Sequence, residues 1–411
     1  MGEIPEDWEV STVGHEFEVK LGKMLDAERN TGVPKPYLGN KAVQWGKIDI
    51  ADLPTVPMSR TDIEKYRLRE GDLLVCEGGE VGRAAIWKAP ISECYYQKAL
   101  HRLRPLRGFN SHVMVELLRQ WADCGVLKNY VTQTSIAHLP REKFMEVPMP
   151  VPPAHEQRAI ATALLDVDTL LDGLVRLIAK KRDLKQATMQ QLLTGQTRLP
   201  GFNEKWDQVR LGDLFSFKNG LNKAKEFFGY GKPIVNYMDV FRCSSVRSEN
   251  LEGRVSLSRY ELKNFDVQKG DVFFTRTSET TEEIGLASVM LDQPTDTVFS
   301  GFLLRARPRG EHLNDGFKAY CFGSAWVRQQ ITSKASYTTR ALTNGKILSE
   351  VLLPIPPLLE QAAIATVLSG IDAELAALDA RLSKTRALKQ AMMQELLTGK
   401  TRLPTPEAAY A

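Results

Sequence analysis

The chain has 411 residues, enough for two domains that each bury a core. Hydrophobic residues make up 43% and charged residues 25%, as in ordinary globular proteins, and a net charge of +4 is compatible with nucleic acid without requiring it. No apolar run approaches 18 residues and the first ten residues are acidic and mixed, so neither a transmembrane helix nor a signal peptide is expected. Widely spaced cysteines of odd number favour reduced thiols in a cytoplasm over disulfides or a zinc site: Cys76, Cys94, Cys124, Cys243 and Cys321.

Residues 1–149 read as a mixed α/β domain. Short β-rich runs such as "GDLLVCE" alternate with turn residues, and residues 112–131, "HVMVELLRQWADCGVLKNYV", have a helical pattern. Three polar segments stand out in this domain, "EGGEVGR" at 77–83, "YYQK" at 95–98 and "TQTS" at 132–135.

Residues 150–200 predict one long helix. It opens after a Pro-Pro pair with Glu156 in the first turn, and closes at Gly195. From residue 155 to 193 it would be about 58 Å long. Its apolar residues have heptad spacing: Ile160, Leu164, Val167, Leu171, Leu174 and Ile178.

Residues 201–353 predict a second mixed α/β domain, with β-rich runs "GDVFFTR" and "ASVML". Its polar segments are "FKNGLNKAK" at 217–225, "TRTSETTEE" at 275–283 and "SYTTR" at 336–340.

Residues 354–404 repeat residues 150–200 at a constant offset of 204, without a gap and with 29 of 51 positions identical. The apolar stripe recurs at Ile364, Leu368, Ile371, Leu375, Leu378 and Leu382. Weaker echoes in the preceding domains, such as Trp8 and Gly14 against Trp206 and Gly212, indicate two copies of one unit. We therefore expect an α/β (α+β) fold with an internal pseudo-twofold, in which two target-binding domains are separated by an antiparallel coiled-coil pair, and a short tail at 405–411.

Chain closure is also expected. The segment "TRLPGFNEKW" joins the first helix to the second domain. In the same way the second helix ends with "TRLP", and the first domain begins with "IPEDW". The first domain is therefore positioned to receive the end of the second helix.

Motifs for catalysis are weak. The sequences "PVPPAHEQ" and "PIPPLLEQ" lack the acceptor and the aromatic residue that flank Pro-Pro in amino-methyltransferases, and "TGKT" at 398–401 has Gln394 where a phosphate-binding loop needs glycine. Asp7 with Glu18 and Lys20 gives only a loose nuclease pattern without a counterpart in the other half. No glycine-rich turn for S-adenosylmethionine or a dinucleotide and no nucleophile elbow is found, so no catalytic residue, metal ligand or cofactor is expected in this chain.

The polar segments contain residue types that contact base edges and phosphates. The candidate DNA-binding residues of the first domain are Glu77, Gly78, Arg83, Tyr96, Gln97, Lys98, Gln133, Thr134 and Ser135. Those of the second domain are Lys218, Asn219, Lys223, Arg276, Thr277, Ser278, Tyr337, Thr338, Thr339 and Arg340.

On "PVPPAHEQRAIATALL", "PIPPLLEQAAIATVLS", the "LKQ…LLTG" endings and the half-chain repeat, the chain resembles the specificity subunit of a type I restriction–modification system. The resemblance implies that each variable domain binds one half of a bipartite, asymmetric double-stranded DNA target. It also implies that the paired helices set the gap and bind two modification subunits. These bind S-adenosylmethionine and methylate adenine, and restriction subunits join them.

Two alternatives remain open from the residues alone. One is a helical adaptor whose two domains bind proteins or small ligands instead of DNA. The other is a self-contained DNA methyltransferase or nuclease, which the missing motifs disfavour.

Overall fold

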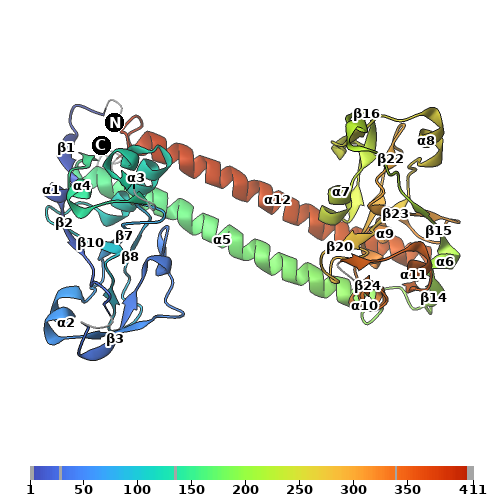
Figure 1. The fold of residues 1–411 in the computed structure, drawn as a ribbon, viewed down its shortest axis with the longest axis horizontal. Coiled ribbons are helices and arrows are strands. Elements are labelled where there is room, and N and C mark those ends of the chain that lie inside the picture. Colours follow the sequence, from blue (N-terminus) through green and yellow to red (C-terminus); the bar gives the residue numbers. More distant parts are fainter. Residues whose placement is uncertain (1–3, 27–29, 134–136, 338–339, 405–411) are drawn as a thin grey trace. The chain divides into compact units, whose positions relative to one another are not determined.

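The computed structural model describes residues 4–26, 30–133, 137–337 and 340–404. The chain divides into two compact units. Unit 1 comprises Met1–Leu174 with Arg381–Ala411, and unit 2 comprises Val175–Ala380. Each long helix therefore contributes residues to both units (Figure 1). The expected half-chain repeat with two α/β halves is confirmed.

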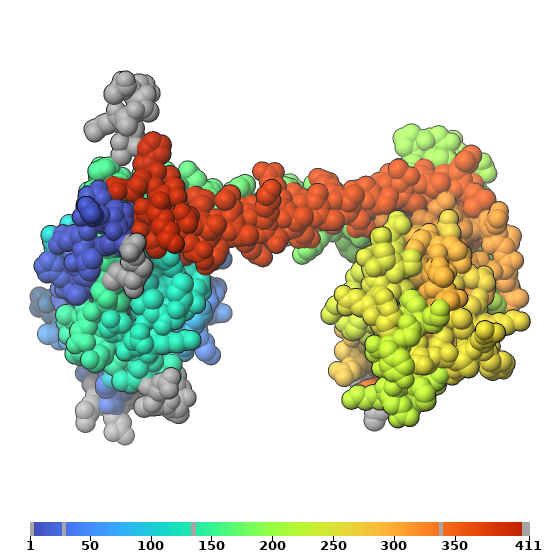
Figure 2. All heavy atoms as spheres, turned by 90° about the horizontal axis from the view of Figure 1, so that it is seen from above, coloured from blue at the N-terminus to red at the C-terminus, as the bar shows by residue number. Residues whose placement is uncertain are grey.

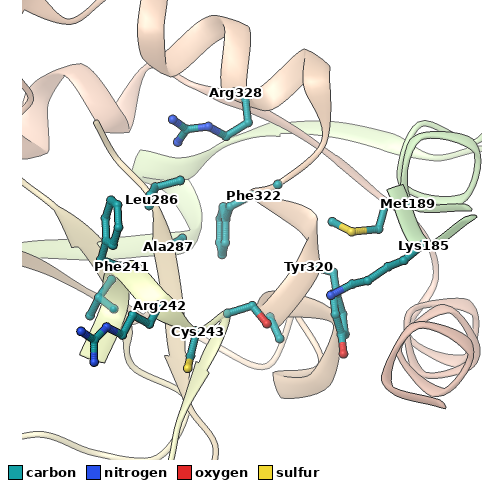
Figure 3. Close-up of a pocket in the computed structure, with 14 residues that line it drawn as sticks. Lys185, Met189, Phe241, Arg242, Cys243, Leu286, Ala287, Tyr320, Phe322 and Arg328 are labelled. Atoms are coloured by element: carbon teal, nitrogen blue, oxygen red, sulfur yellow. The ribbon is translucent and has the colours of Figure 1, made fainter. Parts of the chain in front are cut away.

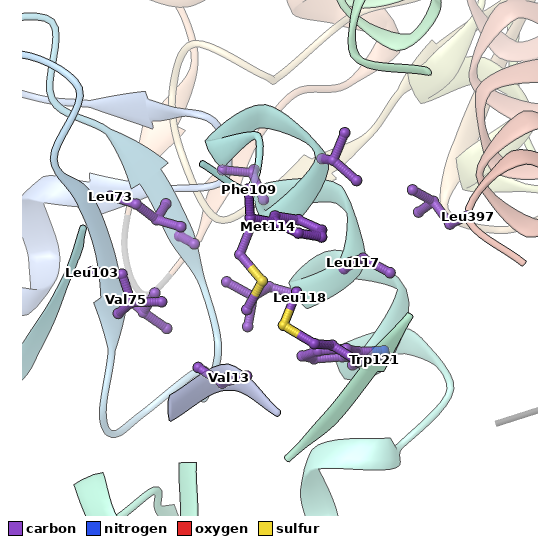
Figure 4. Packing of buried hydrophobic residues seen from close by; sticks show 14 of the residues in the cluster. Val13, Leu73, Val75, Leu103, Phe109, Met114, Leu117, Leu118, Trp121 and Leu397 are labelled. Atoms are coloured by element: carbon purple, nitrogen blue, oxygen red, sulfur yellow. The ribbon is translucent and has the colours of Figure 1, made fainter. Parts of the chain in front are cut away.

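The main sheet of unit 1 is antiparallel and has the order β2-β10-β7-β8. Its strands are β2 (Phe17–Leu21), β10 (Leu100–Pro105), β7 (Leu73–Cys76) and β8 (Ala84–Ile86). Helix α3 (Ser111–Asp123) begins at Asn110, whose side chain accepts from two backbone N–H groups of the first turn. Met114, Leu118 and Trp121 of α3 point toward the sheet and close the core (Figure 4).

Smaller elements complete unit 1. The strand β1 (Glu9–Thr12) pairs with β13 (Pro148–Val151), and a second sheet has the order β6-β3-β9 with β6 (Thr55–Met58), β3 (Val33–Leu38) and β9 (Tyr95–Tyr96). Two short hairpins are β4 (Val43–Gln44) with β5 (Lys47–Ile48), and β11 (Thr132–Gln133) with β12 (Ala137–His138). The short helices are α1 (Val13–Glu16), α2 (Arg60–Tyr66), α4 (Arg141–Met145), η1 (Asn40–Ala42) and η2 (Val126–Tyr130).

The main sheet of unit 2 has the same strand order as that of unit 1, with β17 added at one edge. The order is β15-β23-β19-β21-β17, with β15 (Phe215–Asn219), β23 (Leu303–Pro308), β19 (Val272–Thr275), β21 (Ala287–Met290) and β17 (Ser245–Val246). The strand β14 (Asp207–Arg210) pairs with β26 (Leu352–Ile355). The sheet β18-β16-β22 comprises β18 (Arg254–Val255), β16 (Phe228–Val235) and β22 (Val298–Phe299).

The remaining elements of unit 2 are a three-stranded sheet and short helices. The sheet β20-β25-β24 comprises β20 (Thr277–Ser278), β25 (Ala341–Leu342) and β24 (Ser336–Tyr337). The helices are α6 (Leu211–Leu214), α7 (Tyr237–Arg242), α8 (Arg259–Asn264), α9 (Asp315–Cys321), α10 (Ala325–Ser333), α11 (Gly345–Ser349), η3 (Lys225–Phe227) and η4 (Ser248–Asn250).

The echo of Gly14 in Gly212 has a packing cause. A Cβ atom added at Gly14 would lie 2.9 Å from Cβ of Met145, and one added at Gly212 would lie 2.9 Å from Cβ of Ser349. In both units a four-residue helix therefore packs against a short helix more closely than a side chain permits.

The two long helices are α5 (Ala154–Leu193) and α12 (Leu358–Leu396), which confirms the predicted bounds. The "E-Q" pair of each helix holds its first turn in place. Gln157 Oε1 accepts from the backbone N–H of Asn110 at 2.8 Å, and Gln361 Oε1 accepts from that of Asn314 at 2.8 Å. Each glutamine thus joins the start of a long helix to the cap of a helix on the main sheet.

The glutamate before each glutamine binds an arginine from the "TRLP" segment that follows the other long helix. In unit 1 Arg402 Nε donates to Glu156 at 2.6 Å and also ion-pairs with Asp7, while in unit 2 Arg198 Nε donates to Glu360 at 2.6 Å. The end of α12 accordingly lies against the N-terminal residues of unit 1 (Figure 2). Chain closure is confirmed.

Within each unit α5 and α12 run side by side in opposite directions (Figure 1). Lys181 pairs with Glu374 and Lys185 with Asp372 in unit 2, so numbers rise along one helix as they fall along the other. The residues of the two apolar stripes form the seam between the helices. Four of them are half-buried, namely Val167, Leu171, Ile371 and Leu378. The others are buried: Ile160, Leu164, Leu174, Ile178, Ile364, Leu368, Leu375 and Leu382.

The seam also has a second role. Ile160 and Leu164 belong to the core cluster of unit 1, and Ile364 and Leu368 belong to that of unit 2. The first two residues of each apolar stripe therefore pack on a globular core as well as along the helix pair.

By length and composition α12 could cross a membrane, so the expectation that no such segment exists is wrong on this criterion. Core helices of soluble proteins can have the same length and composition. Ile364 and Leu368 of α12 are buried in the core of unit 2, and Glu360 and Asp372 form ion pairs. Part of the apolar surface of α12 is therefore buried within unit 2.

Because Lys389 is buried, we expect its ion pair to contribute more to the free energy of unfolding than the equivalent ion pair of Lys185. Lys389 is 5% exposed, with its Nζ 2.7 Å from Asp168 and 3.1 Å from the buried Glu116. Lys389→Met removes the nearer cation of Glu116 and leaves only Arg119, at 3.5 Å, which should lower the free energy of unfolding by about 3 kcal/mol. The equivalent Lys185 pairs with Asp372 nearer to solvent, so Lys185→Met should cost about 1 kcal/mol or less. Urea unfolding measures both, and equal losses would contradict this ranking.

A buried histidine predicts acid lability. His101 on β10 is fully buried, its Nε2 lies 2.9 Å from the carbonyl oxygen of Leu139, and burial lowers its pKa to about 4. The unfolded chain therefore binds the proton first, and stability is lost as pH falls from about 6.5 to 4, by up to about 3 kcal/mol.

The equivalent position in β23 is Leu304, so His101→Leu is the matched variant. We expect it to be less stable at pH 7.5, by about 1 kcal/mol for the unpaired Leu139 carbonyl, but to lose less stability between pH 6.5 and 4. Thermal melting across this range gives the comparison, and parallel curves for both proteins would refute the role of His101.

Candidate nucleic-acid interface

The polar segments predicted from the sequence meet at one edge of each main sheet, beyond the ends of β7 and β19. In unit 1 Gly78 forms a β-bridge with His138, which brings the segment 77–83 to the hairpin β11–β12. In unit 2 Thr277 pairs with Leu342 and Ser278 with Ala341, which brings 275–283 to β24–β25. The side chains at each edge therefore come from loops that are held together by β pairing.

The third segment of each half joins the same edge. In unit 1 Gln97 forms a bridge with Lys23, and the N–H of Glu77 donates to the carbonyl oxygen of Ala99 at 3.0 Å. In unit 2 Leu221 forms a bridge with Ser300. Three segments far apart in sequence thus lie together in both units.

Several predicted residues are occupied by contacts within the protein. Lys218 Nζ donates to the backbone and side-chain oxygens of Asn264, both at 2.5 Å, and burial lowers the pKa of Lys218. Lys223 Nζ donates to Glu261 at 2.8 Å, and this hydrogen bond lowers the pKa of Glu261 to about 2. Both lysines stabilise the fold of unit 2.

Arg83 and Tyr96 are also used internally. Arg83 donates to Glu80 at 3.1 Å and to the carbonyl oxygen of Asn40 at 2.9 Å. Tyr96 is fully buried beside Tyr66, and burial raises its pKa to about 12. The Tyr96 ring is not available to stack on a base, because side chains cover it on all sides.

The side chains of two further predicted residues are buried. Glu77 is 3% exposed and its Oε1 lies 2.8 Å from His138 Nε2, and burial raises the pKa of Glu77. Ser278 Oγ donates to Glu283 at 2.9 Å. These groups position their neighbours rather than contact solvent.

The other predicted residues reach the surface or lie outside the described part. Lys98, Asn219 and Arg340 are exposed, and Gly78, Gln97, Arg276 and Thr277 are half-buried. Thr134, Ser135, Thr338 and Thr339 lie outside the described residues, as do the side chains of Gln133 and Tyr337.

Sequence reasoning missed two residues at this edge. His138, whose side chain is 45% exposed, follows the polar segment 132–135, and Phe302, which is 60% exposed, precedes the buried strand β23. An apolar residue next to a strand of apolar residues gives no sign that it faces solvent. The register against β19 would have given that signal.

The described residues hold no group of three or more His, Cys, Asp or Glu side chains that could bind a metal ion. A cavity of about 210 Å³ in unit 2 lies between α5, α7 and α9 (Figure 3). Its lining includes Phe322, Lys185, which pairs with Asp372, and Arg328, which donates to backbone carbonyls. Lys185 and Arg328 are thus held by the protein, and the cavity presents mainly apolar groups.

Comparison with known proteins identifies the family. The model of the type I restriction modification DNA specificity domain matches residues 5–180 and again residues 203–384. A putative type I restriction enzyme MjaX specificity subunit of Methanocaldococcus jannaschii is 24% identical and aligns over 98% of this chain and 96% of its own length.

Two solved structures share the fold. The type I restriction-modification system S subunit from M. genitalium has a TM-score of 0.56 at 16% identity, covering 96% of this chain and 97% of its own. A chain from a study of complex assembly and conformational transition of the type I R-M system has a TM-score of 0.62 at 18% identity, covering 98% and 100%. These findings do not favour a helical adaptor. The chain belongs to the type I restriction modification DNA specificity domain family and contains that domain twice.

Proposed function

We propose that this chain is the DNA-reading subunit of a type I restriction–modification complex. Residues 1–149 and 201–353 are the target-recognition domains, and each binds one half of a bipartite, asymmetric sequence in double-stranded DNA. The helical spacers 150–200 and 354–404 set the gap between the halves and bind two modification subunits, and 405–411 is a tail. Methyl transfer from S-adenosylmethionine takes place on the modification subunits, and restriction subunits complete the complex.

The observation that carries this proposal is the double occurrence of the DNA specificity domain, on residues 5–180 and 203–384. The structure adds a physical reason for two different half-sites. The backbone of Glu77 and that of Arg276 are held by equivalent hydrogen bonds, whereas the side chains at the edge beyond β7 and β19 differ. One scaffold with two sets of side chains suits an asymmetric target.

The cytoplasm is the proposed location. All five cysteines are free, and Cys76, Cys94 and Cys321 are buried, as expected for structural thiols in a reducing compartment.

The direct test is co-expression of the full chain with a type I modification subunit, followed by mapping of methylated adenines across the host genome. We expect methylation at one asymmetric sequence made of two short specified parts and an unspecified gap. Expression of either protein alone is the control and should give no sequence-specific methylation. Methylation at a continuous or symmetric sequence would refute the proposal.

The spacer predicts a second result. One heptad added after residue 176 in α5 and another at the equivalent place, after residue 380 in α12, keeps the two copies aligned without a gap and preserves both apolar stripes. It lengthens each helix by about 10.5 Å, which corresponds to roughly three base pairs.

The same mapping experiment measures this change. The specified bases should stay the same while the gap becomes longer. A heptad added to only one helix is the matched control, and it should lower activity because the stripes no longer pair. An unchanged gap with both insertions would show that the helices do not set it.

A further inference from the structure

The residue that follows β19, Arg276, is fixed by its backbone on both sides. Its N–H donates to the carbonyl oxygen of Phe302 at 3.0 Å, and its carbonyl oxygen accepts from the N–H of Thr343 at 3.1 Å. The Cα position of Arg276 is therefore set by two neighbouring segments, and only its side chain is free to move.

Arg276 and Phe302 are cross-strand neighbours. The antiparallel register of β19 and β23 pairs Thr275 with Leu303, so the next pair is Arg276 with Phe302. Side chains that face each other in an antiparallel pair lie on the same face, about 5 Å apart at Cβ. The guanidinium group and the phenyl ring thus belong to one small surface.

Phe302 is 60% exposed, and a rigid turn presents it. The N–H of Gly301 donates to the carbonyl oxygen of Leu221 at 2.8 Å, and a Cβ atom at Gly301 would lie 1.9 Å from Oδ1 of Asn222. The hydrogen bond of Gly301 holds the turn beside Phe302. Burial of the exposed phenyl ring under a ligand would be favourable.

Arg276 is unlike the other arginines of the same sheet. Across the part of the chain that the structure describes, the Arg276 guanidinium has no hydrogen-bond or ion-pair partner. By contrast, Arg305 and Arg307 on β23 form ion pairs with Asp266 and Asp271. Arg276 is therefore half-buried, positioned and available to an external acceptor.

The equivalent position in unit 1 holds different chemistry. The N–H of Glu77 donates to the carbonyl oxygen of Ala99 at 3.0 Å, and its own carbonyl oxygen accepts from the N–H of Leu139 at 2.7 Å. The backbone position is the same as that of Arg276, but the carboxylate pairs with His138 and a methyl group replaces the phenyl ring. A position with constant backbone and variable side chain is suited to set specificity.

We propose that Arg276 and Phe302 determine specificity for one base step in the half-site bound by residues 201–353. The Arg276 guanidinium donates to O6 and N7 of a guanine, and Phe302 packs against the methyl group of a neighbouring thymine. These are the partners that the major groove offers to a guanidinium fork and to an apolar ring. The inference rests on the proposed function, because it assumes that this edge binds DNA.

The test uses the complex of the full chain with its modification subunit and a DNA library in which each position of the half-sites is randomised. Arg276→Gln should reduce preference for guanine at one position by about 10- to 100-fold, since the carboxamide matches the edge of adenine rather than that of guanine. Phe302→Ala should reduce preference for thymine at an adjacent position by roughly fourfold, the value of one buried methyl group.

Base analogues make the assignment specific. Replacing that guanine by 7-deazaguanine removes the N7 acceptor and should weaken binding of the unsubstituted complex but not of Arg276→Gln. Replacing the thymine by uracil removes the methyl group, and this replacement should leave DNA binding by the Phe302→Ala variant unchanged. Arg259→Gln, at an exposed arginine of α8, is the control and should keep the full sequence preference.

The outcomes separate this inference from the proposed function. If the unsubstituted complex shows no sequence preference, the proposed function fails. If it reads a bipartite site and Arg276→Gln, with unchanged melting temperature, reads it equally well, only the inference fails. If Arg276→Gln weakens binding equally on all sequences, Arg276 contacts a phosphate. If Arg276→Gln relaxes base preference in the other half-site, Arg276 does not contact the half-site assigned to it. Either result overturns the inference.

Discussion

The ion pair between the first turn of each long helix and the segment that follows the other long helix is the constraint on which the architecture depends. Glu156 is 5% exposed and Glu360 is 1% exposed, so each carboxylate needs a cation in order to be buried. Arg402 and Arg198 supply it, one in each unit. Because each arginine comes from a segment far from its glutamate in sequence, neither unit is complete until both helices have contributed to it.

This constraint explains which parts of the repeat are retained and which diverge. The "PP-x-x-E-Q" and "TRLP" segments hold helix, sheet and chain end together through hydrogen bonds that tolerate few other residue types. The edge beyond β7 and β19 has no such role. Its backbone is fixed by β pairing, so the side chains of Glu77 and Arg276 differ without cost to the fold.

The sequence was sufficient for the helices, the repeat and the closure, because heptad spacing and duplicated motifs are local signals. It was insufficient for the site, because the availability of a polar side chain depends on partners far away in sequence. Lys218 and Lys223 resemble phosphate contacts in sequence but bind Asn264 and Glu261, and Tyr96 is a core residue. Phe302 shows the reverse case, since it is an apolar residue next to a buried strand and is nevertheless exposed.

The same internal pairing bears on how the chain binds DNA. Four arginines on the strands β10 and β23 form ion pairs within the protein, namely Arg102, Arg104, Arg305 and Arg307. These four charges are therefore neutralised locally and add little to phosphate binding. Under the proposed function, the phosphate contacts must come from other cations, on this chain or on partner subunits, whereas the edge beyond β7 and β19 supplies base contacts.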